Sequence, residues 1–400
     1  MSIRLVVTTL VSSAALSAAA LASCTSSPDS PTPSFDAGDF DGNAPATDGG
    51  PNPGDDSSVI TPGDAANDTS TTDAADASDA GKTYPPPTSC TGLDASPGTD
   101  LSCGPNANDD CCASIFVPGG TFLRENNGVT LTSTDNPATL SDFRLDKYEA
   151  TIGRYRAFVN AGFGTQANPP VAGSGANPKI AGSGWDPTWN SGLPADTNAL
   201  LTLLTTCGGD VHPWTTTAST SETVAANCIG YYLSFAFCAW DGGRLPTKAE
   251  RGYAASGGSE QRFYPWSAPD AGASAQAQLD HSYANFGCWE GTPSSDLSVD
   301  GGACTNASDS RVGLYPKGNG KWGHADLAGN LWEWTLDYYT TDPVPCNDCA
   351  AFGYDAGTDY RVVFGGSFED GVDNMNSWSA TPNGPTGGLD YYGVRCAREP

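Results

Sequence analysis

The chain has 400 residues and a formal net charge of −28, with 18 Lys and Arg against 46 Asp and Glu. This negative balance argues against nucleic acid as a partner, because a polyanion is attracted to basic surfaces. The length, together with 48 glycines and 30 prolines, predicts one large or two small domains that contain much irregular structure.

Residues 1–23 are predicted to be a targeting segment that is removed from the mature protein. Arg4 supplies a positive charge, and Leu5 to Ala20 is apolar but too short for a committed membrane span. The run Leu21-Ala22-Ser23-Cys24 resembles the bacterial lipobox, which implies cleavage before Cys24 and acylation of this cysteine. A plain secretory signal with a chance cysteine is the alternative. We therefore expect an exported lipoprotein, anchored at the outer membrane or cell surface.

Residues 24–89 are predicted to form a disordered tether. From Thr25 to Ser89 the chain is dominated by Asp, Ala, Gly, Pro, Ser and Thr, with twelve Asp and a single Lys82. Such a segment cannot bury enough apolar surface to offset its ordering entropy. Residues 1–89 carry −10 of the charge, which leaves −18 on the rest of the chain.

Thirteen cysteines fit an exported protein in an oxidising setting. Acylation of Cys24 leaves twelve, an even number that allows six disulfides. Four of them lie in a Cys-rich segment over residues 90–114: Cys90, Cys103, Cys111 and Cys112. Zinc is the rival interpretation, but no C-x-x-C occurs there and export favours disulfides.

Cys346 and Cys349 do form a C-x-x-C. A redox motif of this kind requires a helix N-terminus after a strand, whereas Pro343 and Pro345 precede this one. We expect a local disulfide that closes a loop.

The folded domain is predicted over residues 115–400. Expected strands lie at 115–122, broken by a turn, and at 143–146, 361–368 and 391–397. Three helices are expected: one starts at Thr151 and ends at Gly162, one covers 233–240, and one begins at Thr247. In the last, T-K-A-E forms a capping box with Thr247 as N-cap and Glu250 three residues later.

Residues 323–334 read G-H-A-D-L-A-G-N-L-W-E-W. Asp326 and Glu333 bracket a Gly-Asn turn, and carbonyl groups between them could complete a site for a hard cation. Chemistry alone favours the alternative, a tryptophan-rich core turn with two solvated acids.

An ordered series of motifs runs through residues 117–397 and resembles the formylglycine-generating enzyme family, also called sulfatase-modifying factor. The series is V-P-G-G-T-F, D-K-Y-E-A-T-I-G-R-Y, G-R-L-P-T-K-A-E, Y-P-W, Y-A-N, L-A-G-N-L-W-E-W, F-G-G-S-F and G-V-R-C-A. The resemblance implies an α+β fold related to C-type lectins, with little regular secondary structure and a small twisted antiparallel sheet.

The resemblance also implies structural calcium. Asp326 and Glu333 would supply side chains to one ion, and Gly329 and Leu331 would supply backbone carbonyls. A second site would begin at Asn285 with the carbonyl of Phe286. Its later acid falls in a region that resembles an insertion, where Asp296 and Asp300 are candidates.

The family has two disulfides, and this chain has the cysteines for only one of them. One implies a bridge between Cys238 and Cys396. The other maps to Ala255 and Ala380, so both of its cysteines are missing together.

The family oxidises a sulfatase cysteine to formylglycine with two copper-binding cysteines that follow G-G-S-[FY]. Aligned from Gly365, these cysteines fall on Asp370 and Met375, and a carboxylate with a thioether cannot form a bis-thiolate site. We therefore expect no copper and assign no catalytic residue, although the family's pocket serine is retained as Ser367. Two other positions differ: the usual tryptophan is Arg251, and a usual acidic residue is Leu233.

Two functions follow. The first is a binding or structural module whose cleft takes a protein, peptide or glycan, with Trp378, Tyr391 and Tyr392 as candidate lining residues. The alternative is an oxidoreductase that forms formylglycine with rearranged cysteines, for which Cys346 and Cys349 are the best candidates. The histidines at 212, 281 and 324 form no H-x-x-x-H or E-x-x-H for an iron triad, and the chain has no G-x-S-x-G for a serine hydrolase.

Overall fold

The computed structural model describes residues 84–91, 102–124, 136–209, 211–269, 279–287, 311–353 and 359–400. The predicted signal segment, Cys24 and most of the tether lie outside these ranges, as do Asp296 and Asp300. Within the described ranges, no helix has both the length and the apolar character needed to cross a bilayer.

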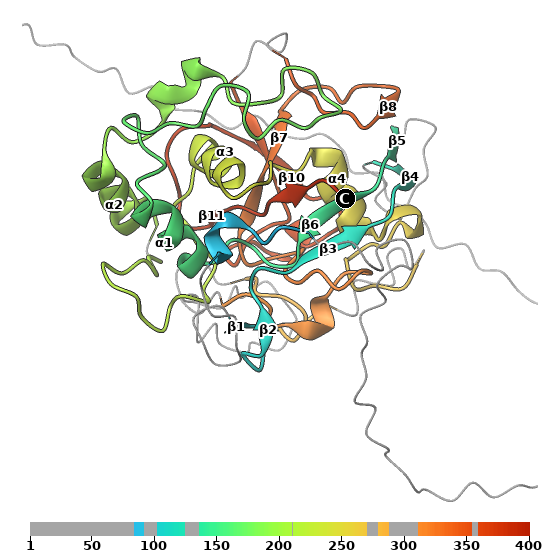
Figure 1. Cartoon of the computed structure of the whole chain (residues 1–400). Helices are drawn as coiled ribbons and strands as arrows, with labels where there is room; N and C mark the ends of the chain where they lie inside the picture. The colour runs from blue at the N-terminus through green and yellow to red at the C-terminus, as the bar shows by residue number, and fades with distance from the viewer. Residues whose placement is uncertain are drawn as a thin grey trace, which may run out of the picture. The chain divides into compact units, whose positions relative to one another are not determined.

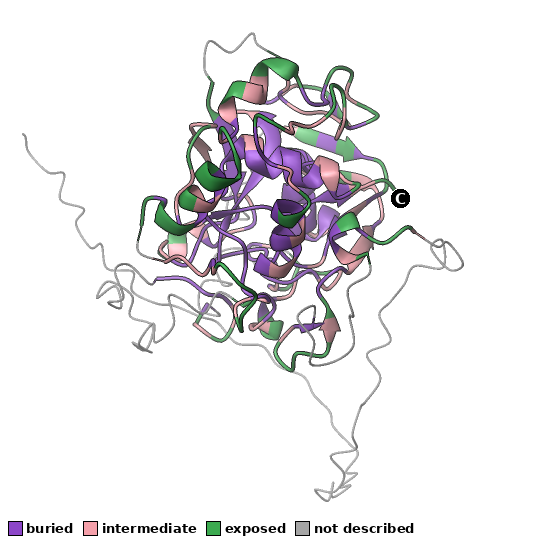
Figure 2. Cartoon of the chain, turned by 60° about the vertical axis from the view of Figure 1, so that its left-hand side comes forward, coloured by how far each residue is buried: buried purple, intermediate pink, exposed green. Residues whose placement is uncertain are grey.

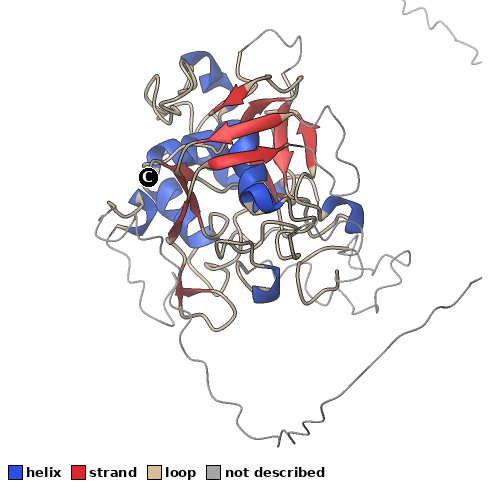
Figure 3. Ribbon diagram, turned by 90° about the vertical axis from the view of Figure 1, so that its right-hand side faces the viewer, coloured by secondary structure: helices blue, strands red, loops and turns tan. Residues whose placement is uncertain are grey.

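Short strands form several small sheets, as Figure 3 shows. The largest has the order β10-β9-β7-β11, and two three-stranded sheets have the orders β12-β6-β3 and β4-β5-β8. The strands of these sheets are β3 (Ser114–Val117), β4 (Gly120–Leu123), β5 (Pro137–Leu140), β6 (Phe143–Asp146), β7 (Trp332–Tyr338), β8 (Cys346–Asn347), β9 (Arg361–Phe364), β10 (Ala380–Asn383), β11 (Tyr392–Gly393) and β12 (Ala397–Arg398). A separate hairpin pairs β1 (Ser102–Cys103) with β2 (Asp109–Asp110). Most pairs are antiparallel, but β11 runs parallel to β7 and β5 runs parallel to β8.

The described residues form four α-helices, which are labelled in Figure 1. They are α1 (Ile152–Asn160), α2 (Thr197–Thr206), α3 (Tyr231–Trp240) and α4 (Lys248–Ser256). The Thr151 side chain caps α1, and the predicted capping box of Thr247 and Glu250 is complete at the start of α4. Helix α3 begins two residues before its predicted start, and Gly230 at its N-cap offers no side chain to mark the beginning of the helix.

The main core lies between helices α1 and α3 and strands β7 and β9, where buried residues are concentrated (Figure 2). Tyr155, Phe158 and Phe237 form a buried aromatic group at the helix contact. Trp334 extends the core from β7 and donates its indole N–H to the Ile229 carbonyl at 2.7 Å. Burial of these large rings supplies much of the driving force for a domain with little regular structure.

The folded region begins earlier than residue 115. Ser89, which we assigned to the tether, is buried, and its backbone N–H donates to the Asp241 carboxylate at 2.7 Å. Disulfides Cys90–Cys112 and Cys103–Cys111 then tie the Cys-rich segment together. Cys103, Cys111 and Cys112 are buried in one cluster with Tyr148 and Leu331, so the segment is part of the folded unit. Its cysteines form disulfides and do not bind zinc.

Candidate functional site

The chain leaves β9 through Gly365 and Gly366, which both have left-handed backbone angles. A Cβ atom on Gly366 would lie 2.6 Å from the backbone oxygen of Asn374, and the φ of 76° is strained for other residues, so this position favours glycine. This bend places Ser367, the retained pocket serine, and Asp370, one of the two positions aligned with the copper-binding cysteines, directly after the central sheet.

Asp370 is engaged in local hydrogen bonds. Its Oδ2 accepts the backbone N–H of Ser367 at 2.9 Å and the Ser367 hydroxyl at 2.5 Å. Its Oδ1 accepts the Asn374 amide at 2.7 Å. Both oxygens therefore stabilise the turn, and Ser367 has a carboxylate partner but no histidine base.

Met375 is a core residue. Its side chain is fully buried and packs with Phe263, Phe286 and Ala328. A flexible thioether fills an irregular apolar gap well. At the two positions where the family holds copper, this chain has a turn-forming carboxylate and a packing residue.

The other candidate thiols are oxidised. Cys346 and Cys349 form a disulfide at β8, which agrees with the predicted local bridge. Cys238 on α3 is bonded to Cys396, the pairing that the resemblance implies. Ala255 and Ala380 stand where the second family bridge would be. Ten described cysteines thus form five disulfides, while Cys288 and Cys304 lie outside the described residues.

The aromatic residues predicted to line a cleft are mainly packed. Tyr392 is buried against Trp334, and Tyr391 contacts Tyr392. Trp378 contacts Phe263 and lines a cavity of about 20 Å³. This volume suits about one water molecule and leaves no room for a peptide.

The segment around residues 326–333 is irregular and then enters β7 at Trp332. Asp326, Gly329 and Asn330 have left-handed backbone angles. The Asp326 carboxylate accepts the Gly313 backbone N–H at 2.6 Å, and the Glu149 carboxylate accepts the Leu331 backbone N–H at 3.0 Å. Burial raises the pKa of Asp326 to about 6, against the opposing effects of the Gly313 hydrogen bond and the Arg395 charge.

Glu333 lies between two arginines. Arg251 on α4 donates its Nε–H to Oε2 at 2.6 Å, and Arg395 donates to Oε1 from Nη2 at 2.8 Å and from Nε at 3.0 Å. All three side chains are fully buried. Burial alone would raise the pKa of Glu333, but the charges of Arg251 and Arg395 outweigh it and hold the pKa below its usual value.

This geometry tests whether Glu333 can bind the calcium ion that is expected at Asp326, Gly329, Leu331 and Glu333. Charge-assisted bonds occupy both Glu333 oxygens, and two guanidinium groups beside them repel a dication. Glu333 in this arrangement does not fit the role of a calcium ligand.

The second predicted site stays a prediction. The Asn285 carbonyl accepts the Asn330 backbone N–H at 2.9 Å, and its amide lies 3.3 Å from the Asn330 side-chain oxygen. The adjacent Phe286 ring is buried. The acid that would complete this site lies outside the described residues.

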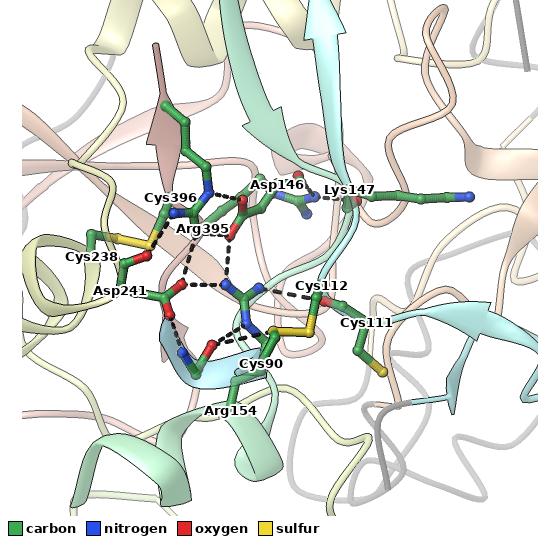
Figure 4. Close-up of polar contacts among 12 residues, drawn as sticks. Cys90, Cys111, Cys112, Asp146, Lys147, Arg154, Cys238, Asp241, Arg395 and Cys396 are labelled. Atoms are coloured by element: carbon green, nitrogen blue, oxygen red, sulfur yellow. Dashed lines mark hydrogen bonds and ion pairs between the residues drawn. A yellow bond between two sulfur atoms is a disulfide. The ribbon is translucent and has the colours of Figure 1, made fainter. Parts of the chain in front are cut away.

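A second buried ionic cluster lies at the N-terminal segment (Figure 4). Arg154 on α1 bonds Asp241 at 2.6 Å and Asp146 at 2.9 Å, and Arg398 bonds the same two acids. Sequence reasoning missed this cluster, because its members come from four separate segments. The two arginines balance the two acids, so the cluster has a structural role and leaves no free carboxylate for a metal.

Cys207, His212 and Cys228 also lie together, but the two sulfurs are bonded to each other. The His212 ring instead contacts the Cys207 carbonyl at 3.0 Å. Without thiolates this group is a disulfide with a neighbouring histidine and is not a zinc site.

The Sulfatase-modifying factor enzyme 1-like domain family matches residues 101–400. The mouse (Mus musculus) formylglycine-generating enzyme is 33% identical over 175 residues, which are 43% of each protein. The mouse inactive C-alpha-formylglycine-generating enzyme 2 is 33% identical over 168 residues, 40% of this chain and 45% of the relative. The chain thus spans about half the length of these curated relatives. Among solved structures, PvdO from Pseudomonas aeruginosa aligns with a TM-score of 0.46 at 18% identity, over 72% of this chain and 94% of PvdO. The match over residues 101–400 shows that the chain belongs to the sulfatase-modifying factor family.

Proposed function

We propose that this protein is a lipid-anchored envelope module that keeps the sulfatase-modifying factor scaffold without its oxidase chemistry. The observation that carries the proposal is the state of Asp370 and Met375. One is the hydrogen-bond acceptor of its own turn and the other is a buried packing residue. Neither can supply the pair of thiolates that the family chemistry needs.

The similarity to a relative described as inactive supports the same proposal. It indicates that this scaffold can persist without formylglycine formation. The rival function, formylglycine formation with rearranged cysteines, loses its best candidates because Cys346 and Cys349 are bonded to each other.

The module's ligand is proposed to be a protein, peptide or glycan of the envelope. A cavity of about 830 Å³ at the N-terminal segment is large enough for part of such a ligand. It is lined by Tyr84 to Thr88 and by polar groups that include Arg144, Asp241 and Arg398. This site lies where the proposed tether joins the domain.

The proposal is tested with purified protein, a peptide containing Cys-x-Pro-x-Arg, copper and oxygen. Mass spectrometry would detect conversion of the thiol to an aldehyde, with mouse formylglycine-generating enzyme as the positive control. We expect the control to convert the peptide and this protein to leave it unchanged. Robust turnover by this protein would refute the proposal.

The anchor requires a separate experiment. Cys24→Ser removes the acylated thiol, so we expect the variant to move from the membrane fraction to the soluble fraction. Retention of the variant in the membrane fraction to the same extent as the unmodified chain would contradict lipid anchoring.

A further inference from the structure

The side chain of Arg251 extends from α4 to the beginning of β7. Its Nε–H donates to Glu333 Oε2 at 2.6 Å, and its Nη2 donates to the Leu327 carbonyl at 2.9 Å. One guanidinium group therefore binds a carboxylate and a backbone carbonyl of the same irregular segment. Carboxylate and carbonyl oxygens are also the ligands that calcium ions bind in proteins.

Arg395 completes the arrangement from the other side. Its Nη2 donates to the Ala325 carbonyl at 2.8 Å as well as to Glu333, and its Nη1 donates to the Asp146 carbonyl at 3.1 Å. Figure 4 shows Arg395 beside Asp146 and Lys147. Two positive groups thus hold Glu333 and several backbone oxygens in place.

The identity of residue 251 links these contacts to the calcium that the family resemblance implies. The family resemblance places a tryptophan here, which has no charge, whereas this chain has an arginine that touches the predicted ligand Glu333. We propose that Arg251 acts as a built-in cation at this site, so that residues 325–333 are held by guanidinium groups and not by calcium.

The space around Arg251 agrees with this role. A Cβ atom on Gly365 would lie 2.9 Å from Arg251 Nη2, so the absence of a side chain at Gly365 makes room for the guanidinium. Within the described part of the chain, Arg251 Nη1 is buried without a hydrogen-bond partner. A donor in this state can be satisfied by a water or an anion and repels a cation.

The test measures calcium stoichiometry by isothermal titration of the full chain and three variants. Asp326→Ala removes the other predicted side-chain ligand, whereas Asn would keep an oxygen that calcium can bind, and we expect this variant to bind as many calcium ions as the unmodified chain. Arg251→Trp removes the guanidinium, and we expect it to bind one additional calcium ion that raises its melting temperature. Arg156→Met is the matched control, because it breaks another largely buried arginine pair, with Glu222, and should bind no additional calcium.

Two results would overturn the proposal. One is the loss of a bound calcium ion on going from the unmodified chain to Asp326→Ala. The other is a folded Arg251→Trp variant that binds no more calcium than the unmodified chain. If Arg251→Trp does not fold, the comparison with Asp326→Ala alone decides. A second calcium site at Asn285 does not confuse the outcome, because it contributes equally to all four proteins.

Discussion

The Glu333→Gln variant tests how much of the stability depends on the buried charge between Arg251 and Arg395. The substitution keeps the shape of the side chain but removes its charge, which leaves two fully buried guanidinium groups without their shared counter-ion. Removing one partner of a buried ion pair costs about 3–5 kcal/mol. With a urea slope of about 3 kcal/mol per M for a domain of this size, the unfolding midpoint should fall by about 1–2 M.

The measurement is equilibrium urea unfolding at pH 7, with the disulfides intact and followed by tryptophan fluorescence. Glu260→Gln is the matched control, because Glu260 bonds Arg262 and Lys321 with about a quarter of its side chain exposed. Such an exposed pair contributes about 0–1 kcal/mol. If Glu333→Gln shifted the midpoint no more than Glu260→Gln, the assignment of Glu333 as the central counter-ion would be refuted.

Two further predictions concern the disulfides and the response to acid. Replacing Cys238 and Cys396 by Ala opens a loop with a sequence separation of 158, which should lower the free energy of unfolding by about 5 kcal/mol. Cys346 and Cys349 are separated by only 3, and replacing them should lower it by about 2 kcal/mol. Equal losses in urea unfolding would contradict the loop-entropy reasoning. His324 is buried, and burial followed by the charges of Arg395 and Arg251 lowers its pKa to about 3. Below pH 6.5 His324 therefore binds a proton in the unfolded chain but not in the folded chain. As the pH falls from 6.5 to 3, this difference should lower the free energy of unfolding by about 1.4 kcal/mol per pH unit. Comparison of His324→Gln with the unmodified chain at pH 4.5 and 7 measures this slope, and identical slopes would rule the reasoning out.

The features that sequence reasoning predicted well depend on short-range chemistry. Thr247 and Glu250 form their capping box because both partners lie within one turn of the helix. Thr151 caps α1 for the same reason. Helix α2 was not predicted, although Asp196 caps its first turn and is a signal that could have been used.

The role of Glu333 could not be predicted from its own segment. An acidic residue beside a Gly-Asn turn is equally compatible with a metal ion and with an arginine. Its partners lie 82 and 62 residues away in the sequence. Arg251 was visible as a departure from the family pattern, but only the fold shows that this departure contacts Glu333.

The departures from the family at the copper position and at the first implied calcium site have a common physical form. At the copper position, Asp370 and Ser367 satisfy each other and Met375 fills the apolar space. At Glu333, arginine side chains supply the positive charge. At both sites the side chains are engaged in contacts within the chain, so placing two cysteines at the copper position would disturb these contacts. Asp370→Cys would remove the acceptor for Ser367 and Asn374, while Met375→Cys would leave a gap against Phe263 and Phe286. The turn that should present the thiolates would lose the contacts that now hold it in place. These contacts at Asp370 and Met375 are what supports the proposed binding module.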